Sequence, residues 1–387
     1  MEEARYLLKS TPIDALLEDK GELLKVQYMT AVGEALQIMR QHQVPSLPVA
    51  VPVESESQEY PNICGAGEDV KNHRDNDLNE LQAAAHKRFV GFLTMLDILV
   101  YLGSKGPEVA KELSKTPVCS ILEFCGEGQR GIAVMSPKTS VLEAIDCMAA
   151  GVQEALVPNA NCICFDSGEE QETSRRKPGA EDGYSVIRQS HLIHFLYSQR
   201  QKLQAVLSQS VETLNVYSTC TFGVLQNTSV TTTLRLMQRN QLSVVPIVDC
   251  FEDFQHVRVG EIHEATGKAI AGSFSVNSLK ECPLEAVSQW AGEGILVFVK
   301  KMNMMRLTGI SLETINADED AAYETNLLVE VSQFSMVTCH KDTSLSDVMK
   351  EALENDVSEV WVVDRQAIMV GLITFSYIFS ALRNAVS

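Results

Sequence analysis

The sequence predicts an α+β protein built from four copies of one helix–strand–strand–helix unit. Three observations support this prediction: one segment recurs four times without gaps, each copy passes from helical to strand patterning, and each copy then offers a second strand followed by a second helix. The search for internal repeats comes first because a missed repeat misassigns the whole fold. The copies begin at Thr30, Thr139, Thr228 and Thr343.

The first element of each copy is an amphipathic helix. Its opening threonine is predicted to be the N-cap, because a threonine oxygen can accept a hydrogen bond from a free backbone N–H of the first turn. Apolar residues then recur at helical spacing, which predicts one buried face; in the first copy they are Val32, Ala35, Leu36 and Met39. Methionines at the last of these positions are typical of core filler rather than of ligands; they are Met39, Met148 and Met237, with Ala352 in the fourth copy.

Two strands and a second helix complete each copy. Short Val-rich runs bounded by polar residues predict buried strands; they read SLPVAV, EALVP, SVVPIVD and EVWVVD. A second apolar run then continues into another helical pattern in each copy; these segments read RFVGFLTMLDILVYL, YSVIRQSHLIHFLY, AIAGSFSVNSLKE and AIMVGLITFSYIFSALR.

Composition excludes several classes of protein. The 387 residues are 45% hydrophobic and carry a formal charge of -19, so we expect two or more domains and neither a general nucleic-acid binder nor a binder of acidic membranes. Ten cysteines without a CxxC pair indicate reduced thiols, and no secretory signal or membrane-spanning run is visible. We therefore expect a location in the cytoplasm or nucleus.

The repeat resembles a known family. Its order of threonine, amphipathic helix, strand and then a GxxTxxD motif opening a helix, as in GFLTMLD, is similar to the cystathionine-beta-synthase (CBS) domain. Four copies in tandem resemble the gamma regulatory subunits of AMP-activated and SNF-related protein kinases. The segment LTGISLETINADEDAAYE and the long acidic insertions look most like the divergent plant gamma-like branch.

This resemblance implies an architecture, a set of partners and no enzymatic activity of its own. CBS domains pair into Bateman modules, so four are expected to form two modules stacked in a disc with clefts between paired units. The predicted partners are a kinase catalytic subunit and a beta-type subunit, with AMP, ADP or ATP as the only expected ligand. The predicted domains are 1–105 with an insertion at 52–87, 106–200 with an insertion at 159–183, 205–282, and 283–387 with its leading segment.

The GxxTxxD positions carry the predicted nucleotide site. In the family, the acid is implied to bind ribose hydroxyls, while the hydroxyl residue and nearby basic residues meet phosphate. The matching pairs in the four copies are Thr94 and Asp97, Arg188 and His191, Ser275 and Ser278, and Thr374 and Tyr377. Because only the first pair keeps the acid, we expect one competent site at most. The candidate basic residues are Arg40, His42, Arg188, His191 and His194.

Several interpretations remain open on the sequence alone. Thr94 and Asp97 also fit a helix N-terminus, where a capping hydroxyl and a first-turn acid are common. His191 and His194 lie one helical turn apart, but no third metal ligand has suitable spacing, which favours a structural role. The disc could sense adenine nucleotide, serve as a scaffold with degenerate clefts, or act alone on another partner. No nucleotide-binding loop, nucleophile motif or kinase signature is visible.

Overall fold

A computed structural model shows how the four copies are arranged. It describes residues 2–17, 23–51, 82–83, 85, 88–105, 112–125, 132–159, 183–219, 221–240, 242–248, 261–276, 283–309, 315 and 336–386. Nearly all of the two predicted insertions lies outside these residues, as does Ser278.

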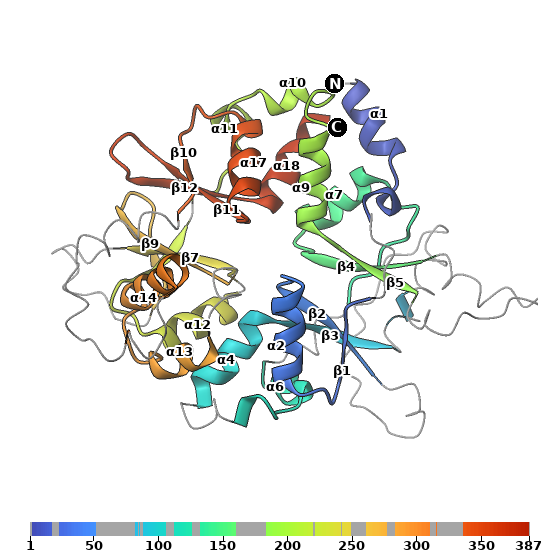
Figure 1. Ribbon diagram of the computed structural model, residues 1–387. Helices are drawn as coiled ribbons and strands as arrows, with labels where there is room; N and C mark the ends of the chain where they lie inside the picture. The colour runs from blue at the N-terminus through green and yellow to red at the C-terminus, as the bar shows by residue number, and fades with distance from the viewer. Residues whose placement is uncertain are drawn as a thin grey trace, which may run out of the picture.

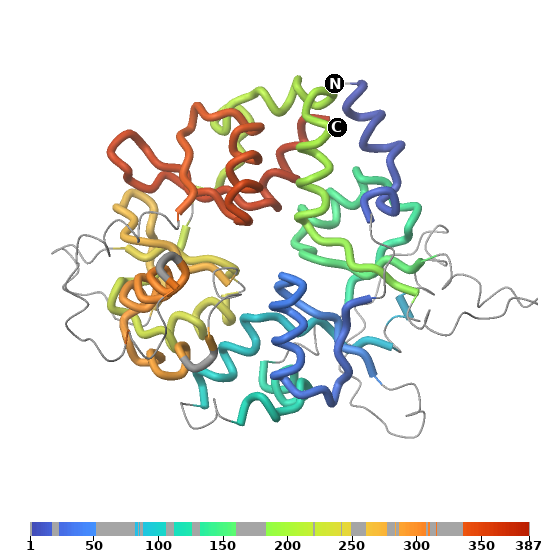
Figure 2. The backbone as a smooth tube through the Cα atoms, in the orientation of Figure 1, coloured from blue at the N-terminus to red at the C-terminus, as the bar shows by residue number. Residues whose placement is uncertain are grey.

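Four units are arranged in a ring (Figures 1 and 2). Unit 1 contains α2 (Val32–Gln41), β2 (Ser46–Ala50), β3 (Phe89–Thr94) and α4 (Met95–Lys105). Unit 2 contains α7 (Val141–Ala149), β4 (Glu154–Pro158), β5 (Tyr184–Arg188) and α9 (Gln189–Ser198). Unit 3 contains α12 (Val230–Arg239), β7 (Val244–Val248) and β9 (Ile270–Ser275). Unit 4 contains α17 (Leu345–Glu354), β11 (Glu359–Val363), β12 (Met369–Thr374) and α18 (Phe375–Val386).

The predicted pair of strands is present in every unit and is antiparallel. A shorter strand that the sequence did not reveal runs parallel to the first strand of units 1, 3 and 4; these strands are β1 (Val26–Gln27), β6 (Phe222–Leu225) and β10 (Thr338–Cys339). In unit 2 its place is taken by a single bridge between Val134 and Leu156. The sheet of unit 3 gains a further strand, β8 (His263–Glu264), beside β6.

The helix caps differ from the prediction by one residue. Serine, not threonine, caps the first helix of units 2, 3 and 4, because each serine oxygen accepts the N–H three residues later; the caps are Ser140, Ser229 and Ser344. The preceding threonine lies outside the helix, where the Thr343 oxygen accepts the N–H of His340. In unit 1 the cap is Ala31, which has no side-chain bond to offer.

The gapless alignment of the four copies is also wrong at one point. Helix α7 has 9 residues, whereas α2, α12 and α17 have 10. Consequently, the strand of unit 2 begins at Glu154 in the same pairing position as Ser46, Val244 and Glu359. A slip of one residue matters in a strand because it moves every side chain to the opposite face.

Leading segments pack across the predicted domain boundaries. The N-terminal helix α1 (Glu2–Ser10) and the 3-10 turn η1 (Ile13–Leu16) pack on unit 2, where Ile13 donates its N–H to the carbonyl of Thr139. Helix α6 (Val118–Cys125) packs instead on unit 1. The second half repeats this exchange: α10 (Gln204–Leu207) and α11 (Val211–Leu214) lie on unit 4, while α14 (Ile295–Thr308) lies on unit 3. Helix α13 (Leu284–Gln289) contacts α4 of unit 1.

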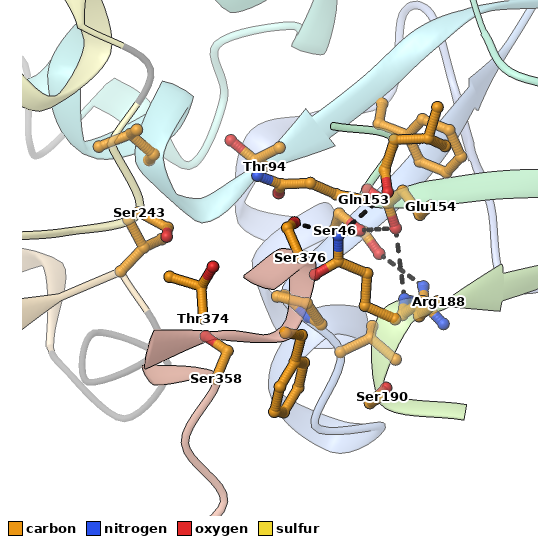
Figure 3. A pocket seen from close by; sticks show the side chains of 18 of the residues that line it. Ser46, Thr94, Gln153, Glu154, Arg188, Ser190, Ser243, Ser358, Thr374 and Ser376 are labelled. Atoms are coloured by element: carbon orange, nitrogen blue, oxygen red, sulfur yellow. Dashed lines mark hydrogen bonds and ion pairs between the residues drawn. The ribbon is translucent and has the colours of Figure 1, made fainter. Parts of the chain in front are cut away.

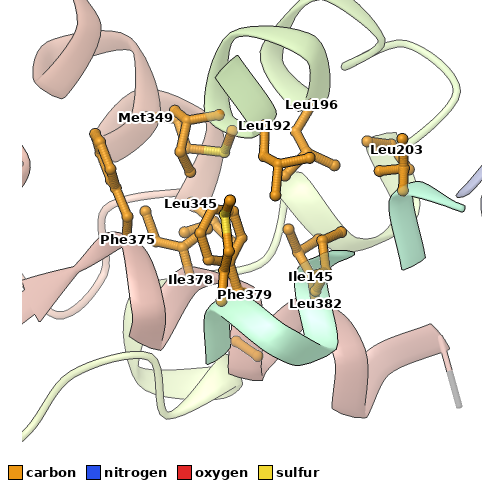
Figure 4. Packing of buried hydrophobic residues seen from close by; sticks show 14 of the residues in the cluster. Ile145, Leu192, Leu196, Leu203, Leu345, Met349, Phe375, Ile378, Phe379 and Leu382 are labelled. Atoms are coloured by element: carbon orange, nitrogen blue, oxygen red, sulfur yellow. The ribbon is translucent and has the colours of Figure 1, made fainter. Parts of the chain in front are cut away.

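Two kinds of contact close the ring. Sheets join units 1 and 2 and units 3 and 4, so these pairs are the two modules. Helices join the modules to each other, with α4 against α12 and α7 against α18. The core between units 2 and 4 includes Ile145, Leu192, Met349 and Phe379 (Figure 4). The predicted fold class, four tandem units in two modules forming a disc, is therefore confirmed.

Buried residues explain why no unit stands alone. Met39, Met148 and Met237 are at most 2% exposed, which confirms their prediction as core filler. Each fully buried side chain of this size stabilises the fold by about 1.5–3 kcal/mol relative to exposure. Much of this burial lies between units, so removing one unit would expose the core of its neighbours.

Candidate functional site

A central cavity of about 830 Å³ lies where the four units meet. This volume falls in the range typical of sites for small ligands. The cavity is walled mainly by hydroxyl, amide and apolar groups from all four units (Figure 3). Its polar lining includes Gln43, Ser46, Thr94, Asp97, Gln153, Glu154, Arg188, Gln189, Ser190, His191, His194, Gln238, Ser243, Asp356, Ser358, Thr374 and Ser376.

Two junctions of each unit build this cavity. The first is the turn after the first helix, where a residue with positive φ reverses the chain; Gln43, Gly151 and Asp356 take this place in units 1, 2 and 4. The second is the point where the second strand becomes the second helix, which is the position of the predicted site residues. Both junctions point inward because the sheets radiate from the centre of the ring (Figure 1).

Thr94 and Asp97 lie in the cavity wall and form a helix capping box. The backbone N–H of Thr94 donates to Asp97 Oδ2 at 2.9 Å, and the N–H of Asp97 donates to Thr94 Oγ1 at 3.2 Å. The Thr94 hydroxyl also donates to the same carboxylate oxygen, and Asp97 is only 2% exposed. The pair therefore serves the start of α4 through the reciprocal bonds that such boxes provide.

Arg188 belongs to an ion pair that joins units 1 and 2. Its Nε lies 3.3 Å from Glu154 Oε2, and its NH2 group donates to the carbonyl of Ser46 at 3.3 Å. The Ser46 hydroxyl in turn donates to Glu154 Oε2. Burial raises the pKa of the Glu154 carboxyl, while the Arg188 charge and the Ser46 hydrogen bond act to lower it.

In unit 2, His191 occupies the position that Asp97 has in unit 1, and it likewise caps the start of its helix. Its Nδ1 accepts the backbone N–H of Arg188 at 3.2 Å, which requires the ring nitrogen to be unprotonated. Burial, followed by the nearby charges of Arg188 and His194, lowers the pKa of His191 to about 4. The ring is thus neutral near pH 7 and adds no positive charge to the cavity.

The other predicted site residues divide into two groups. Thr374 and His194 line the cavity, and Gln189 beside them donates to Ser376 at 3.1 Å, which links units 2 and 4. Outside its described lining lie Ser275, which is buried in β9, and two exposed residues of unit 1, Arg40 and His42. Tyr377 is 39% exposed and also lies outside the lining.

Sequence reasoning missed Glu154 and Ser46. The gapless alignment matched Ala155, rather than Glu154, with Ser46. It therefore did not reveal the acid that pairs with Arg188. A signal was present, because Glu359 opens the equivalent strand of unit 4 and Glu154 is one residue from that position. Recognising the shorter helix of unit 2 would have brought the two acids into register.

The charge of the cavity wall is unfavourable for phosphate. Its carboxylates are Asp97, Glu154 and Asp356, whereas its one guanidinium among the described lining belongs to Arg188. Anion sites in proteins normally combine cations with free backbone or hydroxyl donors. Here the cation is already paired, so the cavity suits uncharged hydrogen-bonding groups better than multiply charged anions.

Metal binding and membrane insertion find no support in the described residues. Within these ranges no group of three or more His, Cys, Asp or Glu side chains could hold a metal ion. None of the helices in the described part of the chain is long and apolar enough to span a bilayer.

Comparisons with known proteins agree with this architecture. A family model of the CBS domain matches residues 330–384, which contain unit 4. Among solved structures, protein MJ1225 from Methanocaldococcus jannaschii, described as a candidate archaeal homologue of g-AMPK, aligns with a TM-score of 0.54 and 13% identity. This alignment covers 96% of this chain and 99% of that one. The fold and the repeat thus resemble those of tandem CBS domains, and the family model identifies one such domain in unit 4.

Two curated proteins of Arabidopsis thaliana are similar along the whole length. SNF1-related protein kinase regulatory subunit gamma-like PV42b is 25% identical over 371 residues, which cover 96% of this chain and 94% of that protein. Its counterpart PV42a is 24% identical over 395 residues, covering 100% of this chain and 98% of that protein. The resemblance to the plant gamma-like branch is thereby confirmed.

Proposed function

We propose that this chain is a non-catalytic regulatory subunit of a SNF1-related Ser/Thr protein kinase complex and that its disc acts as a binding scaffold. The proposed partners are the kinase catalytic subunit and a beta-type subunit. The main support is the full-length similarity to gamma-like regulatory subunits together with the closed ring of four units. A closed ring presents broad rigid faces, which suits a scaffold.

Co-expression with a SNF1-related catalytic subunit and a beta-type subunit tests this proposal. The expected result is a stable complex that co-elutes in size-exclusion chromatography. Gly371→Ala, which disturbs the joint between units 3 and 4, should weaken the complex, whereas Gly272→Ala in unit 3 should not. Failure of the wild-type chain to co-elute with either subunit would contradict the proposal.

A second candidate function is adenine-nucleotide sensing at the central cavity. It is favoured by Thr94 and Asp97, the predicted pair, both of which line the cavity. Regulation would require the ligand to bind two states of the kinase complex with different affinity.

Calorimetric titration with AMP and ATP tests this second candidate. Asp97→Asn is the suitable variant because an amide oxygen can still accept the Thr94 N–H, so the cap is retained while the charge is removed. Sensing predicts nucleotide binding that Asp97→Asn weakens. The absence of binding at millimolar concentration would remove this candidate and leave the scaffold function untouched.

A further inference from the structure

The guanidinium in the central cavity is already paired with an acid of the same chain. Glu154 and Arg188 face each other across β4 and β5 as the first and last residues of the two strands. The Arg188 Nε to Glu154 Oε2 separation is 3.3 Å, and the side chains are only 19% and 14% exposed, respectively. Both residues belong to the cavity wall, as Figure 3 shows.

Ser46 holds this ion pair in position from the neighbouring unit. Its hydroxyl donates to Glu154 Oε2, and its carbonyl accepts from the Arg188 NH2 group. One serine thus contacts both members of the pair, which fixes the carboxylate against the guanidinium. The three residues form one mostly buried set of contacts, in which Arg188 Nε lies 3.3 Å from Glu154 Oε2 as an ion pair without a hydrogen bond.

Such a pair competes directly with an external anion. A phosphate would have to displace Glu154, which is tethered beside Arg188 and therefore present at high effective concentration. It would also leave the displaced carboxylate close to the phosphate, and like charges brought together out of water are strongly unfavourable. An uncharged ligand meets neither penalty.

The remaining polar wall of the cavity suits an uncharged ligand. Ser190, Ser243 and Thr374 contribute hydroxyls from three different units, and Gln153 contributes an amide. These groups can both donate and accept hydrogen bonds, so they match the hydroxyls of a sugar or nucleoside.

We propose that Glu154 is the specificity-determining residue of the central cavity: by occupying Arg188 it excludes phosphorylated ligands and leaves a site for an uncharged, polyhydroxylated molecule of nucleoside size. This inference goes beyond the scaffold function, and it competes with the second candidate function because it assigns to the same cavity an unphosphorylated ligand in place of a nucleotide.

Calorimetric titration of the full chain with adenosine and with AMP tests the proposal, because the two probes differ only by the phosphate. The wild-type chain should bind adenosine at least about tenfold more tightly than AMP, a difference of about 1.4 kcal/mol. Glu154→Ser, which places in unit 2 the residue that unit 1 carries at the same strand position, should reverse this preference. Glu154→Gln, nearly identical in shape, provides a second variant.

The double variant Glu154→Ser/Arg188→Met is the control. It lacks the guanidinium, so the gain in AMP affinity should disappear. Three results would overturn the proposal: AMP binding by the wild-type chain as tight as adenosine binding, no adenosine binding at millimolar concentration, or an unchanged preference in both Glu154 variants. The titration needs no kinase subunit, so its outcome is separate from that of the co-elution experiment.

Discussion

The joint between units 3 and 4 differs from the joint between units 1 and 2. Main-chain hydrogen bonds cross the joint between units 3 and 4: Met369 donates its N–H to the carbonyl of Lys268, and its own carbonyl accepts the N–H of Gly267. In the described part of the joint between units 1 and 2, side chains make the polar contacts, chiefly those of Ser46, Glu154 and Arg188. The two modules share a fold but hold their halves together by different means.

This difference has consequences for stability and for ligand binding. Main-chain bonds do not depend on side-chain identity, so the joint of units 3 and 4 is sensitive mainly to packing and backbone clearance. An ion pair depends on charge and pH, so the joint of units 1 and 2 is sensitive to electrostatics. The module of units 1 and 2 also contributes three of the charged residues in the cavity wall, Asp97, Glu154 and Arg188.

The largest expected effect concerns the aromatic core of each joint. Trp361 is 1% exposed and packs with Leu225, Val248 and Met369 of units 3 and 4. Trp361→Ala should lower the free energy of unfolding by about 4 kcal/mol, because it removes a large buried side chain and leaves a cavity. Urea denaturation measures the change, with Trp361→Phe as a milder control.

Phe89 offers the matching test in the other joint. It is 2% exposed and meets Tyr184 of unit 2 edge to face, with ring centroids 5.6 Å apart. Phe89→Ala should cost about 3 kcal/mol by the same mechanism. If either alanine variant were as stable as the wild type, the corresponding aromatic residue would not stabilise the contact between its two units.

Backbone clearance gives the next largest effect. A Cβ at Gly371 would lie 2.5 Å from the carbonyl oxygen of Ser218 and 2.6 Å from Tyr217 Cδ2. Gly371→Ala should therefore destabilise the protein by about 3 kcal/mol through overpacking. At Gly272 the nearest atom is the end of the Leu296 side chain at 3.3 Å, so Gly272→Ala should cost less than about 1 kcal/mol.

Thermal denaturation of the two glycine variants measures this contrast. Equal stability of Gly371→Ala and Gly272→Ala would show that the segment at Ser218 can move aside. Backbone clearance at Gly371 would then not limit the joint between units 3 and 4.

Charge at the other joint gives a smaller, pH-dependent effect. Arg188→Met leaves the Glu154 carboxylate buried without its cation and should destabilise the protein by about 2 kcal/mol near neutral pH. Without Arg188 the pKa of Glu154 rises further, because burial, the largest cause of its shift, remains. Protonation then relieves the cost, so the deficit should shrink as pH falls; Glu154→Gln/Arg188→Met should show no such recovery.

Urea denaturation at several pH values measures this recovery. A deficit of Arg188→Met that stayed constant with pH would mean that Glu154 is not the acid left uncompensated.

The smallest expected effect belongs to His191. Its folded pKa of about 4 lies below the ordinary value of 6.5, so the unfolded chain binds the proton first and stability falls as pH drops from 6.5 towards 4. The loss between about pH 7 and about pH 5.5 should be about 1 kcal/mol. His191→Gln keeps an acceptor for the Arg188 N–H but does not titrate, so this part of the loss should be absent.

A pH series of denaturation curves compares His191→Gln with the wild type. Parallel profiles for the two proteins would show that His191 titrates normally and that accepting the Arg188 N–H does not hold its ring neutral.

Much of the fold follows from the sequence alone. Helical spacing around Met39 and its counterparts, and the Val-rich runs after them, determine the order of elements because each pattern fits only one buried face. The fourfold repeat then determines the fold class, since a small unit of this kind needs neighbours to close its core. Thr94 and Asp97 were likewise identifiable as a pair at a helix start.

Only the tertiary structure decided how the repeats combine and what faces the centre. The exchange of leading segments depends on contacts between distant parts of the chain, as between Ile13 and Thr139, which local patterns do not encode. The shortened helix of unit 2 shifts its strand by one residue, and this shift alone brings Glu154 opposite Arg188. Because a strand alternates its faces, that single residue decides which side chain lies opposite Arg188.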